Sequence, residues 1–286
     1  MLQELARAKI NLTLDILGLR PDGYHELETI MQTIHLHDCL TFQAAEEHIF
    51  LSCTHPDVPA EEDNLIYQAA MLLLEYTRLK LGARIKVQKN IPVAAGLAGG
   101  SADGAAALKG LNRLWRLGLT DGELISLGAR LGADVPFCLF GGTVLARGKG
   151  EVLHSLPCLQ GVGVILVKPS FSVSTARIYK LYDQLYDQMG GGPRPDNKVM
   201  IEALQKKKIS KIGSGLGNVL ERFVSFLYPE IKEIKKALLV AGALGASMSG
   251  SGPTVFGLCE NEEQAIKVAG RLKINSEYTV LVTITV

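Results

Sequence analysis

One segment of the chain has the residue types and spacing of a phosphate-binding loop. From Pro92 to Ala102 it reads PVAAGLAGGSA, and Gly104 adds a fourth glycine shortly afterwards. An alternating strand pattern precedes the segment, and apolar residues recur at helical spacing from Ser101 onward. In such a loop, backbone N–H groups can approach a ligand closely, and the helix N-terminus adds roughly half a positive charge. A lone glycine pair would indicate only a tight turn, but this cluster with its hydroxyl favours a phosphate ligand.

The two common phosphate-binding patterns are both missing from this segment. A P-loop needs GxxxxGK[ST], and no lysine directly follows these glycines. A dinucleotide-binding loop needs GxGxxG, whereas the order here is GLAGGSADG. The segment therefore predicts a phosphate loop of a third kind.

The run HLHDC, residues 35–39, gathers residue types that can ligate a metal. Alternation along a strand places His35 and His37 on one face, with Ile34 and Leu36 on the other. A polar strand face is the favoured interpretation of this run, and the sequence identifies no metal ligand in it.

The surrounding patterns predict the elements that position the loop. Residues 8–15 alternate as a strand with one buried face, residues 64–81 have helical spacing, and residues 83–92 alternate again. The capping-box pattern of residues 120–123 predicts the start of another helix, with Gly132 as its C′ residue.

The second half of the chain is expected to form a separate domain. A strand pattern at 161–169 is followed by helices between about 198 and 240, then by the glycine-rich run AGALGASMSGSGPT and a further strand. The segment 188–197 has the composition of a mobile loop. This mixed order favours an α+β fold rather than a regular βαβ array.

Length and composition limit the class of protein. The 286 residues suffice for two domains or one large one, and thirty basic against twenty-nine acidic residues indicate no nucleic-acid or membrane-surface partner. Five scattered cysteines without a CxxC pair argue against a disulfide framework or zinc site and favour a reducing cytoplasm. No run reaches the ~20 apolar residues of a membrane span, and the N-terminus lacks an apolar signal segment, so we expect a soluble, cytoplasmic protein.

Four segments together resemble the GHMP kinases, the family of galactokinase, homoserine kinase and mevalonate kinase. PVAAGLAGGSADGAAAL resembles the second motif, usually PxxxGLGSSAA, with Ala98 and Gly99-Gly100 where Gly and Ser-Ser are common. AKINLTLDILGLRPDGYHELETIMQTI resembles the first motif, LGADVPFCLFGGTVLARGKGE the catalytic segment and GASMSGSGPTVFGL the third motif. The first three of these segments are most similar to the branch that phosphorylates 4-diphosphocytidyl-2-C-methyl-D-erythritol. The matches run from residue 6 to residue 258 and cover nearly the whole chain.

The resemblance implies that the chain binds ATP with Mg²⁺ and assigns roles to individual residues. Asp134 would be the base that accepts the proton of the acceptor hydroxyl. Lys9 would lie beside Asp134, keep it charged and offset charge on the transferring phosphate, although singly it is typical of a solvated strand face. The sequence does not identify the residues that bind Mg²⁺, and only Ser101 corresponds obviously to a metal ligand of relatives. The residues expected to bind ATP are Pro92, Val93, Ala94, Ala95, Gly96, Leu97, Ala98, Gly99, Gly100, Ser101 and Ala102.

The resemblance also implies a site for a cytidine-linked substrate. Asn11 could hold substrate hydroxyl groups or Asp134, while Tyr24 would stack on cytosine and His25 would hydrogen-bond it. A second ring is expected at Tyr179, with Phe171 and Tyr182 as alternatives, and residues 249–254 are expected to lie against the phosphate loop. The residues expected to bind the substrate are Asn11, Tyr24, His25, Thr175 and Tyr179.

We therefore expect a two-domain α+β GHMP kinase fold of mixed sheets and helices, with its active site in the interdomain cleft. The resemblance implies an N-terminal ATP-binding domain, 1–154, and a C-terminal domain, 155–286. The reaction implied is transfer of the ATP γ-phosphate to the 2-hydroxyl of 4-diphosphocytidyl-2-C-methyl-D-erythritol in the non-mevalonate isoprenoid pathway. The alternatives are a GHMP kinase for another small alcohol, such as homoserine or mevalonate, and a non-catalytic nucleotide-binding regulator. The expected binding partner is a small cytidine diphosphate-linked polyol rather than nucleic acid or a membrane. The oligomeric state is expected to be either a monomer or a homodimer.

Overall fold

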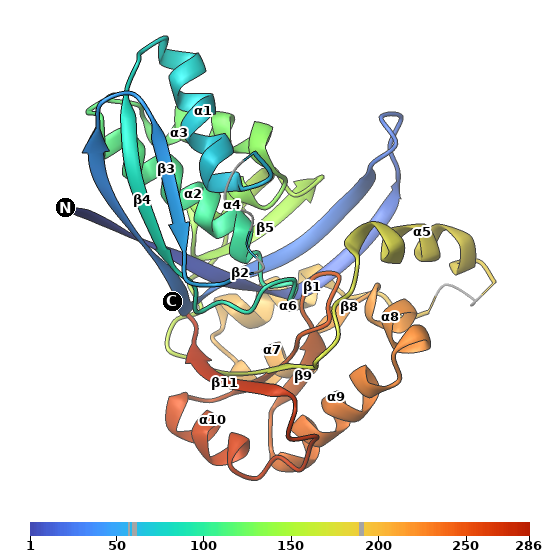
Figure 1. The fold of residues 1–286 in the computed structure, drawn as a ribbon. Helices are drawn as coiled ribbons and strands as arrows, with labels where there is room; N and C mark the ends of the chain where they lie inside the picture. Colours follow the sequence, from blue (N-terminus) through green and yellow to red (C-terminus); the bar gives the residue numbers. More distant parts are fainter. Residues whose placement is uncertain (57, 59–61, 189–191) are drawn as a thin grey trace. The chain divides into compact units, whose positions relative to one another are not determined.

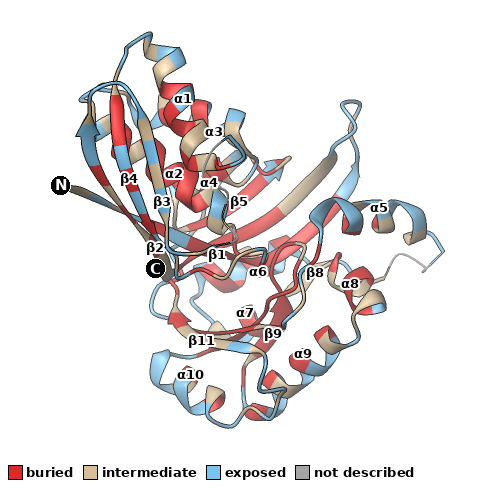
Figure 2. Cartoon of the chain, in the orientation of Figure 1, coloured by how far each residue is buried: buried red, intermediate tan, exposed pale blue. Residues whose placement is uncertain are grey.

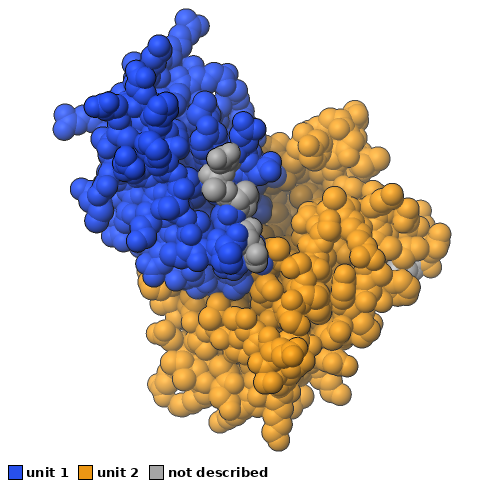
Figure 3. All heavy atoms as spheres, in the orientation of Figure 1, with its two compact units in different colours: residues 1–8, 36–93, 98–141 blue, residues 9–35, 94–97, 142–286 orange. Residues whose placement is uncertain are grey.

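A computed structural model describes residues 1–56, 58, 62–188 and 192–286 of the chain. It divides into two compact units, shown in Figure 3. The segment 188–197, predicted to be mobile, lies partly outside the described residues. The predicted domain boundary between residues 154 and 155 stays a prediction. The first unit comprises residues 1–8, 36–93 and 98–141, and the second comprises residues 9–35, 94–97 and 142–286.

The described residues form a mixed sheet of seven strands and an antiparallel sheet of four (Figure 1). The long strands β1 (Leu2–Leu19) and β2 (His25–Ala45) supply residues to both units. The sequence predicts the central part of β1 correctly but underestimates the length of the strand at both ends.

In the first unit, residues 39–45 of β2 pair antiparallel with β4 (Gly82–Gln88), and β4 pairs parallel with β3 (Ile49–Cys53). Helix α2 packs against α1, α3 and α4. A Cβ at Gly110 of α2 would lie 2.5 Å from the ring of Phe42, so the missing side chain lets the helix approach β2 closely. The helices are α1 (Leu65–Thr77), α2 (Gly99–Leu114), α3 (Asp121–Leu131) and α4 (Val135–Phe140).

The helix starts of the first unit follow from local chemistry. The Asn64 side chain accepts from the backbone N–H of Ile66 (2.8 Å) and caps α1. Thr120 and Glu123 form the predicted capping box of α3. Helix α3 ends at Leu131 and is followed by Gly132, as predicted, but the φ of Gly132 is 175°, an extended conformation open to any residue, so the left-handed region is not what requires glycine there.

In the second unit, residues 27–32 of β2 pair with β5 (Thr143–Gly148), which pairs with β6 (Val152–Ser155), and β1 pairs parallel with β8 (Gly217–Asn218). The antiparallel sheet has the order β11-β7-β10-β9, and α9 and α10 pack against it. Its strands are β7 (Gly163–Lys168), β9 (Gly245–Met248), β10 (Val255–Cys259) and β11 (Thr279–Ile284). The helices are α5 (Thr175–Leu185), α6 (Asn197–Gln205), α7 (Ile209–Ser214), α8 (Glu221–Leu227), α9 (Glu230–Ala241) and α10 (Glu262–Ala269).

Both faces of β1 are buried from Ala8 to Ile16, as Figure 2 shows in red along this strand. The prediction of a strand with one buried face is therefore wrong. The polar residues Lys9 and Asn11 are each 3% exposed, because chain segments far away in sequence cover the second face. A buried lysine needs hydrogen-bonding partners, so its surroundings define the candidate site.

Candidate active site

The predicted phosphate loop alternates between left-handed residues and buried ones. Ala94, Gly96 and Ala98 have φ angles of 51°, 75° and 57°, while Ala95 and Leu97 between them are 3% and 1% exposed. Ala98 is the N-cap of α2 and offers no side-chain hydrogen bond to the first N–H groups of the helix. The first turn of α2 contains no acidic residue either. These features suit an anion at this helix N-terminus.

Three hydrogen bonds hold three successive carbonyl groups of the loop within the second unit. The carbonyls of residues 95–97 accept, in that order, from the backbone N–H of Thr254 (3.4 Å), the hydroxyl of Ser249 (2.9 Å) and the backbone N–H of Lys9 (3.1 Å). Lys9 belongs to the first motif and the other two residues to the third, so three of the sequence motifs meet here. This anchoring uses acceptors of the loop and consumes none of its N–H donors, which are the groups that bind phosphate.

The third motif also lies against the side chain of Lys9. Gly250 has a φ of 57°, which favours glycine, and a Cβ there would lie 3.2 Å from Lys9 Nζ and 3.6 Å from Asn11 Oδ1, so the backbone of the motif closely approaches both side chains. Lys9 Nζ donates to Asn11 Oδ1 at 2.7 Å. Asn218 Nδ2 donates to the carbonyl of Gly250 at 2.8 Å and holds the motif from β8, a contact that no local sequence pattern predicts.

Asp134 lies at the junction of α3 and α4 in the first unit. It is the N-cap residue of α4, but its side chain makes no capping hydrogen bond. Helix capping, the common structural role of an aspartate at this position, therefore does not explain the residue. A Cβ at Gly128 would lie 2.8 Å from Leu139 Cδ1 and 3.0 Å from Val135 Cγ1, so close packing of the two helices fixes this junction. Lys9 lies in the other unit, and its predicted pairing with Asp134 stays a prediction.

The residues predicted to recognise cytosine gather in the second unit. His25 Nε2 lies 2.7 Å from Asp183 Oδ1, and the His25 ring lies 5.0 Å from that of Tyr179 between centroids, tilted by 36°. Tyr24 is 59% exposed, with Lys149 Nζ 3.8 Å from its ring centroid. The geometry thus brings His25 and Tyr179 together, although sequence reasoning did not identify Asp183.

The two alternatives to Tyr179 have other contacts. The ring of Phe171 stacks on that of Tyr228 at 4.4 Å between centroids. Tyr182 is 7% exposed, and burial raises the pKa of its hydroxyl to about 12. Thr175 is exposed at the start of α5, where its Oγ1 lies 2.7 Å from Ser251 Oγ of the third motif.

A buried ion cluster in the first unit was missed by sequence reasoning. Lys89 Nζ lies 2.5 Å from Asp38 Oδ2 and 2.7 Å from Asp103 Oδ2, and each of the three side chains is at most 5% exposed. Asp38 Oδ1 also accepts from the backbone N–H groups of Asn90 (2.5 Å) and Ile91 (2.8 Å). The cluster therefore ties β2 to the chain on both sides of the phosphate loop. Burial and competition with Asp38 for one ammonium raise the pKa of Asp103 to about 7.

The HLHDC run contains one member of this cluster. Alternation places Asp38 on the same face as Ile34 and Leu36, and that signal could have identified it as buried. His35 is exposed on the other face. Within the described part of the chain, no three His, Cys, Asp or Glu side chains are grouped to hold a metal ion.

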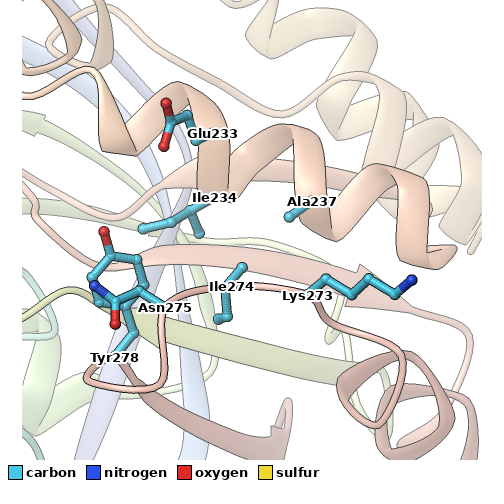
Figure 4. A pocket seen from close by; sticks show the side chains of 7 residues that line it. All are labelled: Glu233, Ile234, Ala237, Lys273, Ile274, Asn275 and Tyr278. Carbon is cyan, nitrogen blue, oxygen red and sulfur yellow. The ribbon is translucent and has the colours of Figure 1, made fainter.

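A separate pocket in the second unit contains none of the predicted site residues (Figure 4). It lies between α9 and the segment that precedes β11. Its lining residues are Glu233, Ile234, Ala237, Lys273, Ile274, Asn275 and Tyr278.

Comparison with known proteins identifies the family. The models for the GHMP kinase N-terminal domain and the GHMP kinase C-terminal domain match residues 64–142 and 200–277. A curated relative from Pelotomaculum thermopropionicum, named 4-diphosphocytidyl-2-C-methyl-D-erythritol kinase, is 51% identical over 98% of this chain and 96% of its own. The chain belongs to the GHMP kinases. This GHMP kinase is also 46% identical to an enzyme of the same name from Acetivibrio thermocellus, over 98% of both chains.

Solved structures agree with this assignment. The GHMP kinase described here superposes on the crystal structure of a 4-(cytidine 5'-diphospho)-2C-methyl-D-erythritol kinase with a TM-score of 0.83, at 33% identity and full coverage of both chains. A homoserine kinase from Cytophaga hutchinsonii has a TM-score of 0.77 at 22% identity, which shows the shared fold alone. The predicted GHMP kinase fold and ATP-dependent kinase class are confirmed. Among the described residues, no helix is both long and apolar enough to cross a membrane.

Proposed function

We propose that this GHMP kinase transfers the γ-phosphoryl group of ATP to the 2-hydroxyl of 4-diphosphocytidyl-2-C-methyl-D-erythritol, giving ADP and the 2-phosphate. The observation that carries the choice of substrate is the grouping of His25, Tyr179 and Asp183 in the unit that also contains Lys9. The relatives with this substrate in their names cover nearly the whole chain. The cytoplasmic location and the choice between monomer and homodimer stay predictions.

The chemistry of the His25 contact suits a cytosine base. When a neutral imidazole donates from Nε2 to a carboxylate such as Asp183, its Nδ1 becomes a hydrogen-bond acceptor. The exocyclic amine of cytosine is a donor and can bind such an acceptor. The aromatic rings of Tyr24 and Tyr179 offer faces on which the base can stack.

The roles of the remaining residues follow from the demands of phosphoryl transfer. Residues 92–102 bind the ATP phosphates through backbone N–H groups and the helix N-terminus. Asp134 orients the acceptor hydroxyl and takes its proton, and Lys9 stabilises negative charge on the transferring group. Asn11 fixes the Lys9 ammonium and can contact substrate hydroxyl groups.

Mg²⁺ accompanies ATP in this proposal. When bound, the ion neutralises phosphate oxygens of the nucleotide. The hydroxyl of Ser101, in the first turn of α2, fits such an ion because Mg²⁺ prefers oxygen ligands. The proposal names no other residue as a ligand of Mg²⁺.

The test is ADP release with ATP and Mg²⁺, comparing the cytidine-linked methylerythritol with homoserine and mevalonate. We expect turnover on the first substrate alone. Asp134→Asn should lower kcat by about 10²–10⁴-fold, as expected for loss of a general base. Asp121→Asn, an exposed aspartate in the same unit, is the matched control and should leave kcat unchanged. Turnover on another alcohol would refute the cytidine assignment, and ATP binding without any turnover would favour a regulator.

The cytosine site is tested separately. His25→Ala and Tyr179→Ala should raise KM for the cytidine-linked substrate while KM for ATP stays unchanged. Tyr228→Ala, which removes a ring from the neighbouring Phe171 stack, is the control for general loss of aromatic packing. If it raised the same KM by as much as Tyr179→Ala, the assigned role of Tyr179 would be wrong.

A further inference from the structure

A chain of buried hydrogen bonds leads from the Lys9 ammonium to the backbone of β1. Lys9 Nζ donates to Asn11 Oδ1 (2.7 Å), and Asn11 Nδ2 donates to Thr29 Oγ1 (2.9 Å). Thr29 Oγ1 in turn donates to the backbone carbonyl of Thr13 (2.5 Å). All four residues are at most 3% exposed. Water therefore has little access to replace any of these partners.

The backbone carbonyl of Thr13, where this series of hydrogen bonds ends, fixes the donor and acceptor of every bond in the series. A backbone carbonyl can only accept, so the single hydroxyl hydrogen of Thr29 is used on the carbonyl of Thr13. Thr29 Oγ1 is then an acceptor toward Asn11 and must receive the amide NH₂ group. The amide oxygen of Asn11 consequently faces Lys9, whose ammonium can only donate.

Thr13, the last residue in this series of hydrogen bonds, is itself held in place by further hydrogen bonds. Thr13 Oγ1 donates to Asn197 Oδ1 (2.6 Å) and accepts from the backbone N–H of Ile30 (3.0 Å). Asn197 Nδ2 donates to Glu28 Oε1 at 2.8 Å. These contacts join β1, β2 and the start of α6, so the carbonyl that orients Thr29 has little freedom to move.

We propose that Thr29 is a positioning residue for Lys9, acting through Asn11. Its hydroxyl sets the orientation of the Asn11 amide, and the amide oxygen then holds the ammonium at one place beside the third motif. Without the hydroxyl, the amide NH₂ group loses its buried partner, and a rotated amide would turn a donor toward the ammonium. The inference rests on the proposed role of Lys9 in stabilising charge during phosphoryl transfer.

The decisive variants are Thr29→Val, which removes the hydroxyl at nearly constant shape, and Thr29→Ser, which keeps it. We expect Thr29→Val to lower kcat by about 10- to 100-fold, as misplacement of a catalytic group does, while KM for ATP stays within about twofold. Thr29→Ser should restore most of kcat. Thr33→Val is the matched control, because Thr33 lies on the same strand, is 7% exposed, and its hydroxyl has no hydrogen-bond partner in the described part of the chain.

A double-mutant cycle with Lys9→Met separates positioning from general structural damage. If Thr29 acts through Lys9, Thr29→Val should have little further effect on kcat in the Lys9→Met background. If Thr29→Val lowered kcat in the Lys9→Met background by the same factor as in the wild type, the inference would be overturned. If Lys9→Met keeps normal kcat, the proposed role of Lys9 fails instead.

Folding of each variant is checked by far-UV circular dichroism and a thermal unfolding curve. Thr29→Ala replaces Thr29→Val in the cycle if the valine variant does not fold, since it removes the same hydroxyl without the branched side chain. Normal kcat in a folded Thr29→Val or Thr29→Ala variant would also overturn the inference.

Discussion

Gly96→Ala is the substitution that tests most directly how the phosphate loop is held. Gly96 has a φ of +75°, and a Cβ there would lie 2.3 Å from the carbonyl oxygen of Ser249 and 2.9 Å from that of Gly252. Both contacts are with backbone, so no side chain can rotate away to relieve them. Alanine therefore forces either the loop or the third motif to move.

The expected cost has two parts. A non-glycine residue in the left-handed conformation costs about 1–2 kcal/mol. Overpacking against a fixed neighbour adds typically about 1–3 kcal/mol. Together they predict a loss of roughly 2–5 kcal/mol in the free energy of unfolding of the folded region that contains the loop.

Gly118→Ala measures the conformational cost alone, without overpacking. Gly118 has a φ of +71°, but a Cβ there would have nothing within 4 Å, so only the conformational cost applies. Urea unfolding curves of both variants and of the wild type, with ATP affinity by calorimetry, provide the measurement. We expect Gly96→Ala to lose about 1–3 kcal/mol more than Gly118→Ala and to bind ATP at least about tenfold more weakly. Equal losses for the two variants, with ATP affinity unchanged in both, would refute the close approach of the two motifs.

Two further predictions concern stability. Because the pKa of Asp103 is raised to about 7, the folded state holds its proton more tightly than the unfolded state, and the free energy of unfolding should fall by roughly 1 kcal/mol between pH 6 and pH 8. Asp103→Asn should remove this fall, measured by urea unfolding at both pH values, and a fall that persists in the variant would assign it to another group. Thr120→Ala should lower the free energy of unfolding by about 1 kcal/mol through loss of the α3 capping box, whereas Thr120→Ser should not, and equal curves for both variants would contradict the role of the cap.

Local patterns predicted the elements of this fold well. The capping box at residues 120–123 is present as expected, and the glycine-rich loop does run from a strand into a helix. These features are determined by neighbours within a few residues, so the sequence contains the full signal. The resemblance of the motifs then predicted the family, which the comparisons confirm.

The partners of the site residues could not be predicted in the same way. Lys9 by itself is typical of a solvated face because alternation does not show what covers a strand, yet Gly250 of the third motif, far along the chain, lies against its side chain. Thr29 has no distinguishing pattern of its own, and its importance follows only from its two hydrogen bonds. The expected contact of residues 249–254 with the phosphate loop is present, because Ser249 Oγ donates to the carbonyl of Gly96, but only the family resemblance predicted it, and the local pattern alone would indicate a turn.

The departure of the loop from the usual form of the second motif coincides with close packing beside the buried ion cluster. A Cβ at Gly99 would lie 3.1 Å from Ile91 Cγ2 and 3.5 Å from Lys89 Nζ, so a serine there would press on the residues that Asp38 holds. A Cβ at Gly100 would meet only a side-chain methyl group at 3.9 Å, so position 100 has room that position 99 lacks. At position 99 the loop therefore has its backbone N–H alone, where the usual form of the motif has a side-chain hydroxyl as well. Within residues 92–102, Ser101 is the remaining hydroxyl, and it lies in the first turn of the helix that we propose binds phosphate.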